Sequence, residues 1–227
     1  MKAKASHAAK LKKLIEETSR RHNTWQVFQD FVAMSAISIR NAVDFRDRDA
    51  YEEQYLAIVK RYDREEIEIF PKMLAELTLA LEDDLSDVLG QVFSELELGN
   101  RWKGQFFTPD CVCRLMATMS YGDGLQTAIA EKGYISVGEP AVGGGAMIIA
   151  LAHEMKRQGL NYQNQLHVTA TDIDLRAVHM SYLQLSLLHI PAVVIHGDTI
   201  RLTEHSRWHT PANLLGAWGK KQLPVAS

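Results

Sequence analysis

Three features that would mark other classes of protein are scarce or missing in this 227-residue sequence. It has no run of eighteen or more apolar residues, the length that a membrane-spanning helix needs, and its Lys-rich start lacks the apolar core of a secretory signal. Its two cysteines, Cys111 and Cys113, are not joined by a second Cys pair or a His cluster that would complete a zinc set. The net charge of -3 gives no global attraction to nucleic acid. We therefore expect a cytoplasmic protein with reduced thiols, no metal site and no contact with a membrane.

Charge is unevenly distributed in the first hundred residues. Residues 1–24 hold seven Lys or Arg against two Glu, whereas residues 62–98 hold eleven acidic residues against two basic ones. The basic segment is either a solvated first helix or a contact for nucleic-acid phosphates. The acidic segment is typical of a solvated helical face and would repel DNA.

The spacing of apolar residues predicts helices through residues 1–103. Such residues recur at intervals of three and four in four stretches: 25–32, 55–62, 74–81 and 88–96. Because a residue before proline is disfavoured in a helix, we expect a new helix to begin with Pro71 in its first turn. We interpret residues 1–103 as an all-helical N-terminal region.

From residue 104 the pattern changes to short apolar runs that alternate with helical segments. The runs lie at residues 134–137, 166–171 and 193–196. Strands that alternate with helices predict a parallel sheet with right-handed crossover connections. We therefore expect a mixed α/β fold, with three strands in residues 104–227 and no strand after Asp198.

Glycines and carboxylates stand at the ends of the three predicted strands. The first strand leads through Glu139 into three glycines at residues 143–145, the second ends at Asp172 and the third at Asp198. Glycine permits a tight turn and close approach of a ligand, and ligands of open parallel sheets bind beyond the carboxyl ends of the strands. Asp172 could accept hydrogen bonds from both hydroxyls of a ribose, and Asp198 from an adenine amino group. The three features together predict a site for a nucleoside cofactor.

Each of these features has a simpler explanation when it is taken alone. The glycines can merely turn the chain, Asp172 can cap a helix and Asp198 can serve as a turn residue, although Asp174 is better placed as the cap. Their position at consecutive strand ends favours the cofactor site. Because the turn is not G-x-G-x-x-G and no G-K-[ST] is present, S-adenosylmethionine is favoured over a nicotinamide cofactor or a nucleotide phosphate.

A well-formed helix start lies upstream of the first strand. Thr108 suits the N-cap, Pro109 the first helical position and Asp110 the positive helix end. That helix N-terminus could also hold the carboxylate of a methionine moiety. We expect the apolar side chains of this helix to face the core: Val112, Leu115, Met116 and Met119.

Four ordered motifs resemble those of adenine-N6 DNA methyltransferases similar to the modification subunit of type I restriction systems. Residues 104–109 look like the family's GQFFTP signature, residues 139–145 like its DPACGSG loop, residues 172–174 like its acidic residue with a helix cap, and residues 197–200 like its GDTL. The resemblance covers about residues 100–200. In two departures, Glu139 replaces the usual Asp, which preserves the charge, and Val142 replaces the usual Cys.

The resemblance implies a partial Rossmann-like S-adenosylmethionine methyltransferase sheet over residues 104–227, truncated after the third strand. It also implies S-adenosylmethionine as the cofactor, DNA as a partner and a place in DNA methylation and restriction-modification. The residues that it implies for cofactor binding are Thr108, Pro109, Glu139, Ala141, Gly143, Gly145, Asp172, Ile173 and Asp198.

The family's catalytic motif, Asn/Asp-Pro-Pro-aromatic after the fourth strand, has no counterpart here. The sequence contains no Pro-Pro pair, and its nearest match is Asn213 with Trp218. In the family's sheet order, 3-2-1-4-5-7-6, the fourth strand pairs with the first, so we expect the strand ending at Glu139 to have an open edge. An enzyme that acts on a base in duplex DNA extrudes it into a pocket. This sequence shows no residues that would form half of that pocket.

Three hypotheses remain open at this point. The first is a methyltransferase-family protein that binds S-adenosylmethionine but is catalytically incomplete, either alone or as part of a split enzyme with a second chain. The second is an active adenine methyltransferase that uses divergent C-terminal residues around Asn213. The third is a non-enzymatic protein that binds a restriction or modification subunit through its helical region and open sheet edge.

Overall fold

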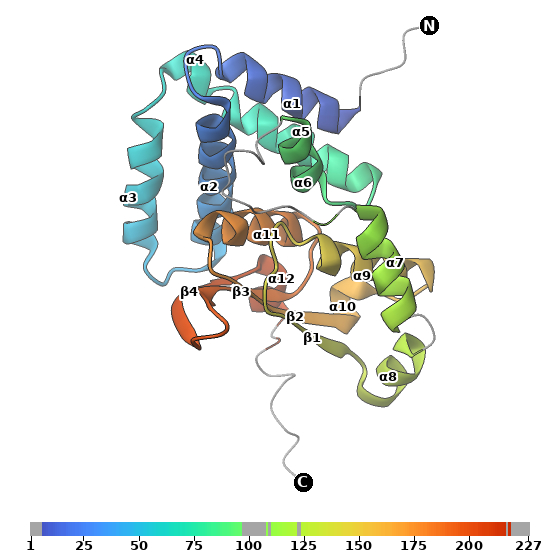
Figure 1. The fold of residues 1–227 in the computed structure, drawn as a ribbon. Helices are drawn as coiled ribbons and strands as arrows, with labels where there is room; N and C mark the ends of the chain where they lie inside the picture. Colours follow the sequence, from blue (N-terminus) through green and yellow to red (C-terminus); the bar gives the residue numbers. More distant parts are fainter. Residues whose placement is uncertain (1–5, 97–107, 109, 122–123, 217, 219–227) are drawn as a thin grey trace, which may run out of the picture.

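The computed structural model describes residues 6–96, 108, 110–121, 124–216 and 218. Figure 1 shows the N-terminal helices stacked above a single sheet, with α11 (Leu175–Leu187) lying between them. A helical N-terminal region followed by a mixed α/β part confirms the predicted fold class.

The described part of residues 6–96 is helical. Its elements are α1 (His7–Thr18), α2 (Thr24–Val43), α3 (Arg48–Val59), α4 (Arg64–Ile67), α5 (Phe70–Asp83) and α6 (Val88–Glu95). As predicted, Pro71 lies in the first turn of α5. It tolerates this place because the first N–H groups of a helix have no partner within the helix.

The basic first helix faces the acidic segment. Lys10 Nζ of α1 lies 3.7 Å from a carboxylate oxygen of Glu76 in α5, and Lys12 Nζ lies 3.7 Å from one of Glu95 in α6. Such partly exposed pairs contribute little stability individually. They do direct part of the positive charge of α1 toward the protein's own acidic helices, and this leaves less of it for nucleic-acid phosphates.

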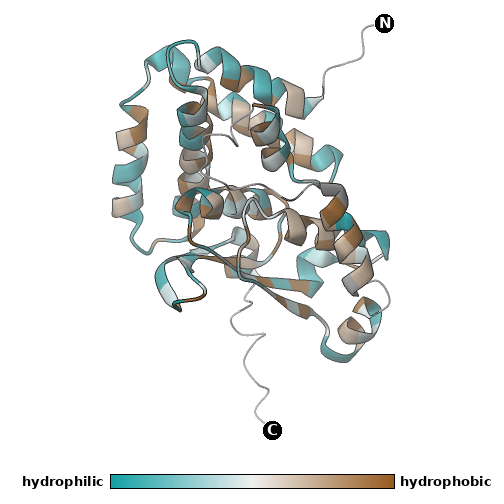
Figure 2. Ribbon diagram, viewed as in Figure 1, coloured by the Kyte–Doolittle hydropathy of each residue, from teal (hydrophilic) through white to brown (hydrophobic). Residues whose placement is uncertain are grey.

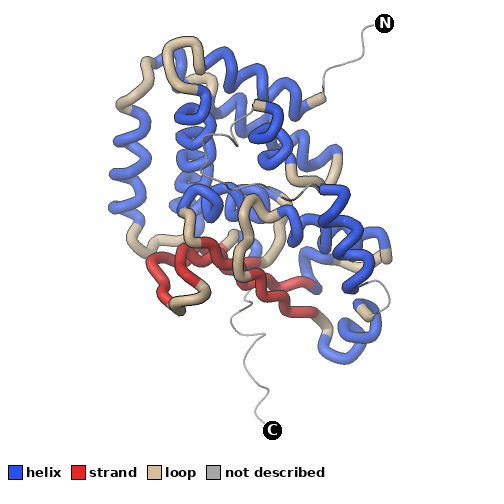
Figure 3. Tube along the Cα trace, viewed as in Figure 1, coloured by secondary structure: helices blue, strands red, loops and turns tan. Residues whose placement is uncertain are grey.

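One sheet contains the strands β1 (Ile135–Glu139), β2 (Leu166–Asp172), β3 (Ala192–Asp198) and β4 (Thr203–His209), in the order β1-β2-β3-β4 (red in Figure 3). The first three strands pair in parallel, as predicted. The expectation that the sheet ends with the third strand is wrong, because β4 pairs with β3 in antiparallel fashion. This strand is mostly polar and exposed, with Trp208 as its buried residue. An antiparallel strand at an edge can face water and needs no apolar run.

The remaining helices are α7 (Asp110–Tyr121), α8 (Leu125–Lys132), α9 (Ala146–Arg157), α10 (Tyr162–Gln165) and α12 (Pro211–Leu215). One side of α11 packs on β2 and β3, and α2 packs against the same helix. Side chains of a strand alternate between the two faces of its sheet. Ser136, Gly138 and Thr169 share the other face and are exposed, so the described residues leave that face partly open.

A single apolar cluster extends through the helical region and the α/β part. It includes Leu11 and Ile15 of α1, Phe31 of α2, Leu183 of α11 and Val194 of β3. The predicted boundary after residue 103 therefore separates two segments that share one core. None of the helices in the described ranges is long and apolar enough to cross a membrane.

The prediction for the buried face of α7 is wrong. The side chains expected in the core are exposed: Val112, Leu115, Met116 and Met119. The buried residues are Cys113 and Ala117, which pack with Ala146 and Ala150 of α9. These small side chains let the two helices pack closely, whereas the periodicity of the larger residues indicates the opposite face. In Figure 2 the ribbon of α7 carries several residues in the brown of high hydropathy.

Candidate cofactor site

The turn between β1 and α9 requires glycine at two positions. Gly143 and Gly145 have φ angles of 53° and 96°, in the left-handed region that residues with a Cβ rarely adopt. The intervening Gly144 is buried, and a Cβ on it would lie 3.4 Å from the carboxylate oxygens of Asp87. α9 begins directly after Gly145. Its first backbone N–H groups, which have no partner within the helix, thus lie beside the carboxyl end of β1.

Asp172, at the end of β2, holds this turn in place. Its Oδ2 accepts a hydrogen bond from the Gly143 N–H at 2.9 Å, and its Oδ1 accepts one from the Asp174 N–H at 2.9 Å. Each carboxylate oxygen can accept a second hydrogen bond, so these contacts leave capacity for ribose hydroxyls. Asp174 caps α11 by accepting from the Arg176 N–H, which confirms its predicted role.

The turn after β3 meets the turn after β1. Thr199 Oγ1 donates to the Pro140 carbonyl oxygen at 2.8 Å, although β2 lies between the two strands. Asp198 Oδ1 accepts from the N–H groups of Ile200 and Arg201 at 2.9 and 3.0 Å, which stabilises this turn. The structure therefore brings the strand-end residues predicted from the sequence together at one end of the parallel strands.

Three further predicted residues lie in the same turns. Glu139 is half-buried, and its Oε1 accepts from the N–H of the exposed Ala141 at 3.1 Å. Ile173 follows Asp172, and 65% of its surface is exposed. An exposed isoleucine beside a strand-end carboxylate gives a planar base an apolar surface to pack on.

The upstream part of the prediction is less fully described. Thr108 is exposed, and its carbonyl oxygen lies 3.8 Å from Cys113 Sγ. Pro109 and residues 104–107 of the GQFFTP motif lie outside the described residues. The described contacts do not join Thr108 to the strand-end turns.

Gln184 of α11, which the sequence analysis missed, joins the glycine turn to the helical region. Its Nε2 donates to the Gly144 carbonyl oxygen at 2.8 Å and to Asp87 Oδ1 at 2.7 Å, while its Oε1 accepts from the Leu89 N–H at 3.0 Å. Asp87 also caps α6 by accepting from the Gly90 N–H at 2.9 Å. The only signal in the sequence is an isolated glutamine among apolar residues of a helix.

Asn213, the nearest match to a catalytic amide, lies near the opposite end of the strands. Its Oδ1 is 3.0 Å from His167 Nε2, and its Nδ2 is 3.0 Å from His209 Nδ1. His167 precedes Asp172 by five residues in β2, which corresponds to roughly 16 Å along a strand. Asn213 is also buried, so the structure contradicts the hypothesis that it acts on a base at the strand-end site.

β1 lies at an edge of the sheet. It pairs with β2, and no strand within the described ranges pairs with its other side, as the sequence predicted. Near its start, the Tyr134 ring packs edge-on against Trp218, with 5.3 Å between the ring centroids. The site is thus built on three parallel strands, of which β1 pairs on one side only within the described part of the chain.

Comparison with known proteins identifies the family. A family model described as N-6 DNA methylase matches residues 81–215, more than half of the chain. The chain belongs to the N-6 DNA methylase family. A solved chain from Listeria monocytogenes, described as a class I S-adenosylmethionine-dependent methyltransferase, is similar with a TM-score of 0.45 and 13% identity. The similarity covers 86% of this chain and 54% of that one, so this chain spans about half its length. No curated protein matches this chain.

Proposed function

We propose that this member of the N-6 DNA methylase family binds S-adenosylmethionine at the carboxyl ends of β1, β2 and β3. The observation that carries the proposal is the joining of the strand-end turns, by Asp172 to Gly143 and by Thr199 to Pro140. Because of these bonds, the glycine turn and the two carboxylates lie at the same end of the parallel strands. A bound cofactor would supply the methyl group.

The residue types in these turns fit the parts of the cofactor. The free lone pairs of Asp172 suit the ribose hydroxyls, Ile173 suits the adenine ring and Asp198 suits the adenine amino group. Helix N-termini favour anions, so the N-terminal end of α7 suits the methionine carboxylate. The proposed cofactor-binding residues are Thr108, Pro109, Glu139, Ala141, Gly143, Gly145, Asp172, Ile173 and Asp198.

We further propose that the chain is the cofactor-binding part of a DNA adenine-N6 methyltransferase of a restriction-modification system in the cytoplasm. Its 227 residues contain no Pro-Pro pair. The open side of β1 is where a fourth strand pairs in the family's sheet order, and unpaired strand edges readily accept another strand. The strand and its catalytic motif would come from residues outside these 227, in a second chain or elsewhere in the same polypeptide. A non-enzymatic role in binding such a subunit would use the same open edge.

Calorimetry with S-adenosylmethionine tests the cofactor site. We expect Ile173→Asp to weaken binding at least about tenfold, or about 1.4 kcal/mol, because it replaces an apolar surface for adenine with a charge. This exposed residue can change without disturbing the core. Leu56→Asp, the same substitution at an exposed position of α3, should bind as the parent does. Equal affinities of the parent and Ile173→Asp, or no binding by the parent, would contradict the proposed site.

Transfer of a labelled methyl group to DNA tests the second proposal. We expect the 227-residue chain to bind the cofactor and yet to transfer no label, because the part of the chain that the structure describes has no catalytic amide at the strand ends. Transfer by this chain alone would show that the chemistry needs no added strand. Cofactor binding and methyl transfer are measured separately, so each proposal can fail by itself.

A further inference from the structure

The side chains of β1 that face the helices are less buried than those of its neighbour β2. In the sheet register, Ile135 pairs with Leu166 and Val137 pairs with Val168, so all four side chains point to the same face. Leu166 and Val168 are fully buried, whereas Ile135 and Val137 are only half-buried. The packing that covers β2 is therefore incomplete at β1, which ends this side of the sheet in the described part of the chain.

α7 has three distinct sides, because successive residues of a helix are roughly 100° apart around its axis. Cys113 and Ala117 point toward α9. Arg114 points toward the N-terminal helices, where its Nη2 donates to Asp84 Oδ2 at 2.9 Å and to the Leu85 carbonyl oxygen at 3.1 Å. The third side, turned away from both contacts, carries the exposed apolar residues: Val112, Leu115, Met116 and Met119.

The helix layer extends farther than the sheet beneath it. α11 packs on β2 and β3, and α9 connects β1 to β2, so a right-handed crossover places α9 over these strands. α7 packs against α9, and Figure 1 shows it on the far side of α9 from α11, with the N-terminal helices above. The apolar side of α7 therefore points toward the level of the sheet, at the position next to β1.

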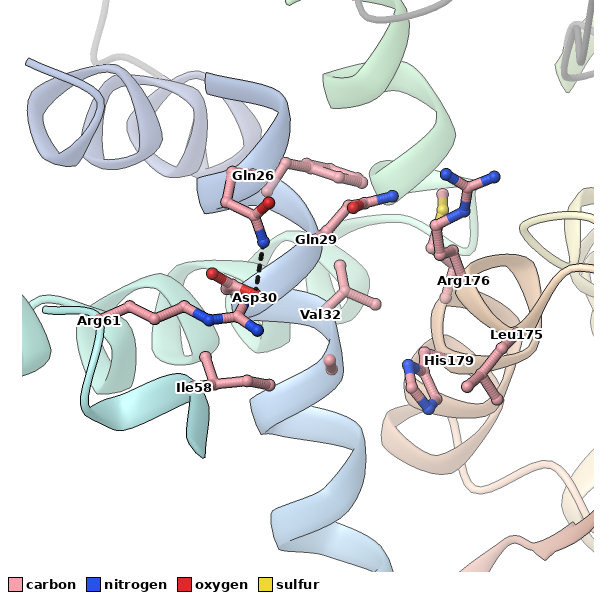
Figure 4. Close-up of a pocket in the computed structure, with 12 residues that line it drawn as sticks. Gln26, Gln29, Asp30, Val32, Ile58, Arg61, Leu175, Arg176 and His179 are labelled. Carbon is pink, nitrogen blue, oxygen red and sulfur yellow. Dashed lines mark hydrogen bonds and ion pairs between the residues drawn. The ribbon is translucent and has the colours of Figure 1, made fainter. Parts of the chain in front are cut away.

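The hollow between α2 and α11 differs from this region, because its charged groups are paired within the chain. Asp30 accepts hydrogen bonds from Gln26 Nε2 and from Arg61 Nη1, both at 2.9 Å (Figure 4). These charges need no partner from outside. At β1, the backbone groups on the side away from β2 have no strand partner among the described residues. The N–H and C=O groups of a strand edge alternate, and another β-strand matches that alternation.

We propose that the free edge of β1 and the apolar side of α7 form one surface, which receives a β-strand from a second polypeptide chain. The strand continues the sheet beside β1, and its side chains on the helix side pack beneath Leu115 and Met119. It therefore carries apolar, β-branched residues at alternate positions. The inference rests on the proposal that the missing strand comes from outside these 227 residues, and it adds α7 as the element that recognises it.

A second copy of this chain fits the surface poorly. Antiparallel pairing of two β1 strands about a two-fold axis perpendicular to the sheet keeps both helix layers on the same side. The two α7 helices, each extending beyond its own β1, would then meet over the junction. A partner whose strand has no helix on that side avoids this conflict.

A synthetic peptide of alternating valine and threonine, with a lysine at each end, is the probe. When the peptide saturates the whole chain, amide hydrogen exchange in Ile135–Glu139 should slow at least about fivefold. The methyl NMR signals of Met116 and Met119 should shift in the same titration. The same peptide with a central proline should bind more weakly, because proline lacks the N–H that pairs with a strand edge.

Two matched variants test the part played by α7. Leu115→Lys should weaken peptide binding about five- to tenfold, because a charge replaces apolar surface that the strand would cover. Leu56→Lys, the same substitution at an exposed position of α3, should bind the peptide as the parent does. Thermal melting confirms that both variants are folded.

Four results would overturn the inference. They are unchanged exchange in β1, unchanged methionine signals, equal binding of the proline peptide, and full affinity in Leu115→Lys. Light scattering that finds a dimer of the parent, lost in Leu115→Lys, would also overturn it by identifying a second copy as the occupant. Because the peptide is titrated without S-adenosylmethionine, loss of peptide binding leaves the cofactor site intact. Failure of the cofactor calorimetry likewise leaves the strand surface intact.

Discussion

Buried polar side chains decide how the glycine turn is held. Asp172 bonds to the turn from β2, and Gln184 bonds to it from α11 while also reaching α6. Asp172 could be predicted because it ends a strand, where a carboxylate has a recognisable chemical role. Gln184 could not, because its partners Asp87 and Leu89 are 97 and 95 residues away in the sequence. Only folding brings them within hydrogen-bond distance.

Replacing Gln184 with leucine should destabilise the protein. The variant leaves the Gly144 carbonyl and the Leu89 N–H without their side-chain partner, and we expect the free energy of unfolding to fall by roughly 2–4 kcal/mol. Urea denaturation followed by circular dichroism measures the change. Gln54→Leu, on the exposed surface of α3, should stay within about 0.5 kcal/mol of the parent. If both variants are as stable as the parent, Gln184 does not couple the two regions.

His179 should make stability depend on pH. Its pKa is about 4 in the folded protein and about 6.5 in the unfolded chain, so below pH 6.5 the unfolded state takes up a proton that the folded state excludes. Its contribution, complete above about pH 6.5, is lost as the pH falls toward 4 and totals on the order of 3 kcal/mol. Nearby His196 adds to this effect, and Asp174 opposes it.

The measurement is the free energy of unfolding between pH 7.5 and 4 for the parent and for His179→Phe. The variant lacks the titrating ring, so its stability should fall less over this range. Burial also lowers the pKa of His167 and His209, and both proteins retain that contribution. Parallel curves for the parent and the variant would exclude His179 as a source of the pH dependence.

At the scale of elements, α7 and β4 show where periodicity fails. Large apolar residues predicted the wrong buried face of α7, because its contact with α9 is made by small side chains. β4 carries almost no apolar pattern, because it is an edge strand with one buried tryptophan. The three parallel strands were predicted correctly, and the apolar runs of β2 and β3 pack beneath α11.

Substitutions on the two faces of α7 should have opposite consequences. Ala117→Leu places a larger side chain in the contact with α9 and should cost about 1–3 kcal/mol of stability. Met119→Gln, on the exposed face, should change stability by less than about 0.5 kcal/mol. Urea denaturation of both variants checks this. A large loss in Met119→Gln would mean that the exposed face is packed against another part of the protein.

At the scale of the whole molecule, the helical region and the sheet share one apolar core. α2 packs on α11, and α11 packs on β2 and β3, so the layers lie one upon another. The polar contacts of Gln184 cross the same interface. Neither layer would keep its buried face covered if the other unfolded.

The two regions should therefore unfold together, although the sequence predicts a domain boundary after residue 103. Hydrogen exchange measured by mass spectrometry across a urea series reports each region separately. We expect peptides from α2 and β2 to lose protection at the same midpoint, because their apolar residues belong to one cluster. Two separate midpoints would instead establish the predicted domains as independent folding units.

The sequence by itself determined the class of fold, the three parallel strands and the acidic and glycine residues at their ends. These features depend on local periodicity and on residue types with a specific role, both of which can be read along the chain. The tertiary structure decided how the strand-end turns join, that Asn213 lies far from them and that Gln184 links α11 to the glycine turn. Each of these depends on contacts between residues far apart in the sequence, which only the packed chain brings together.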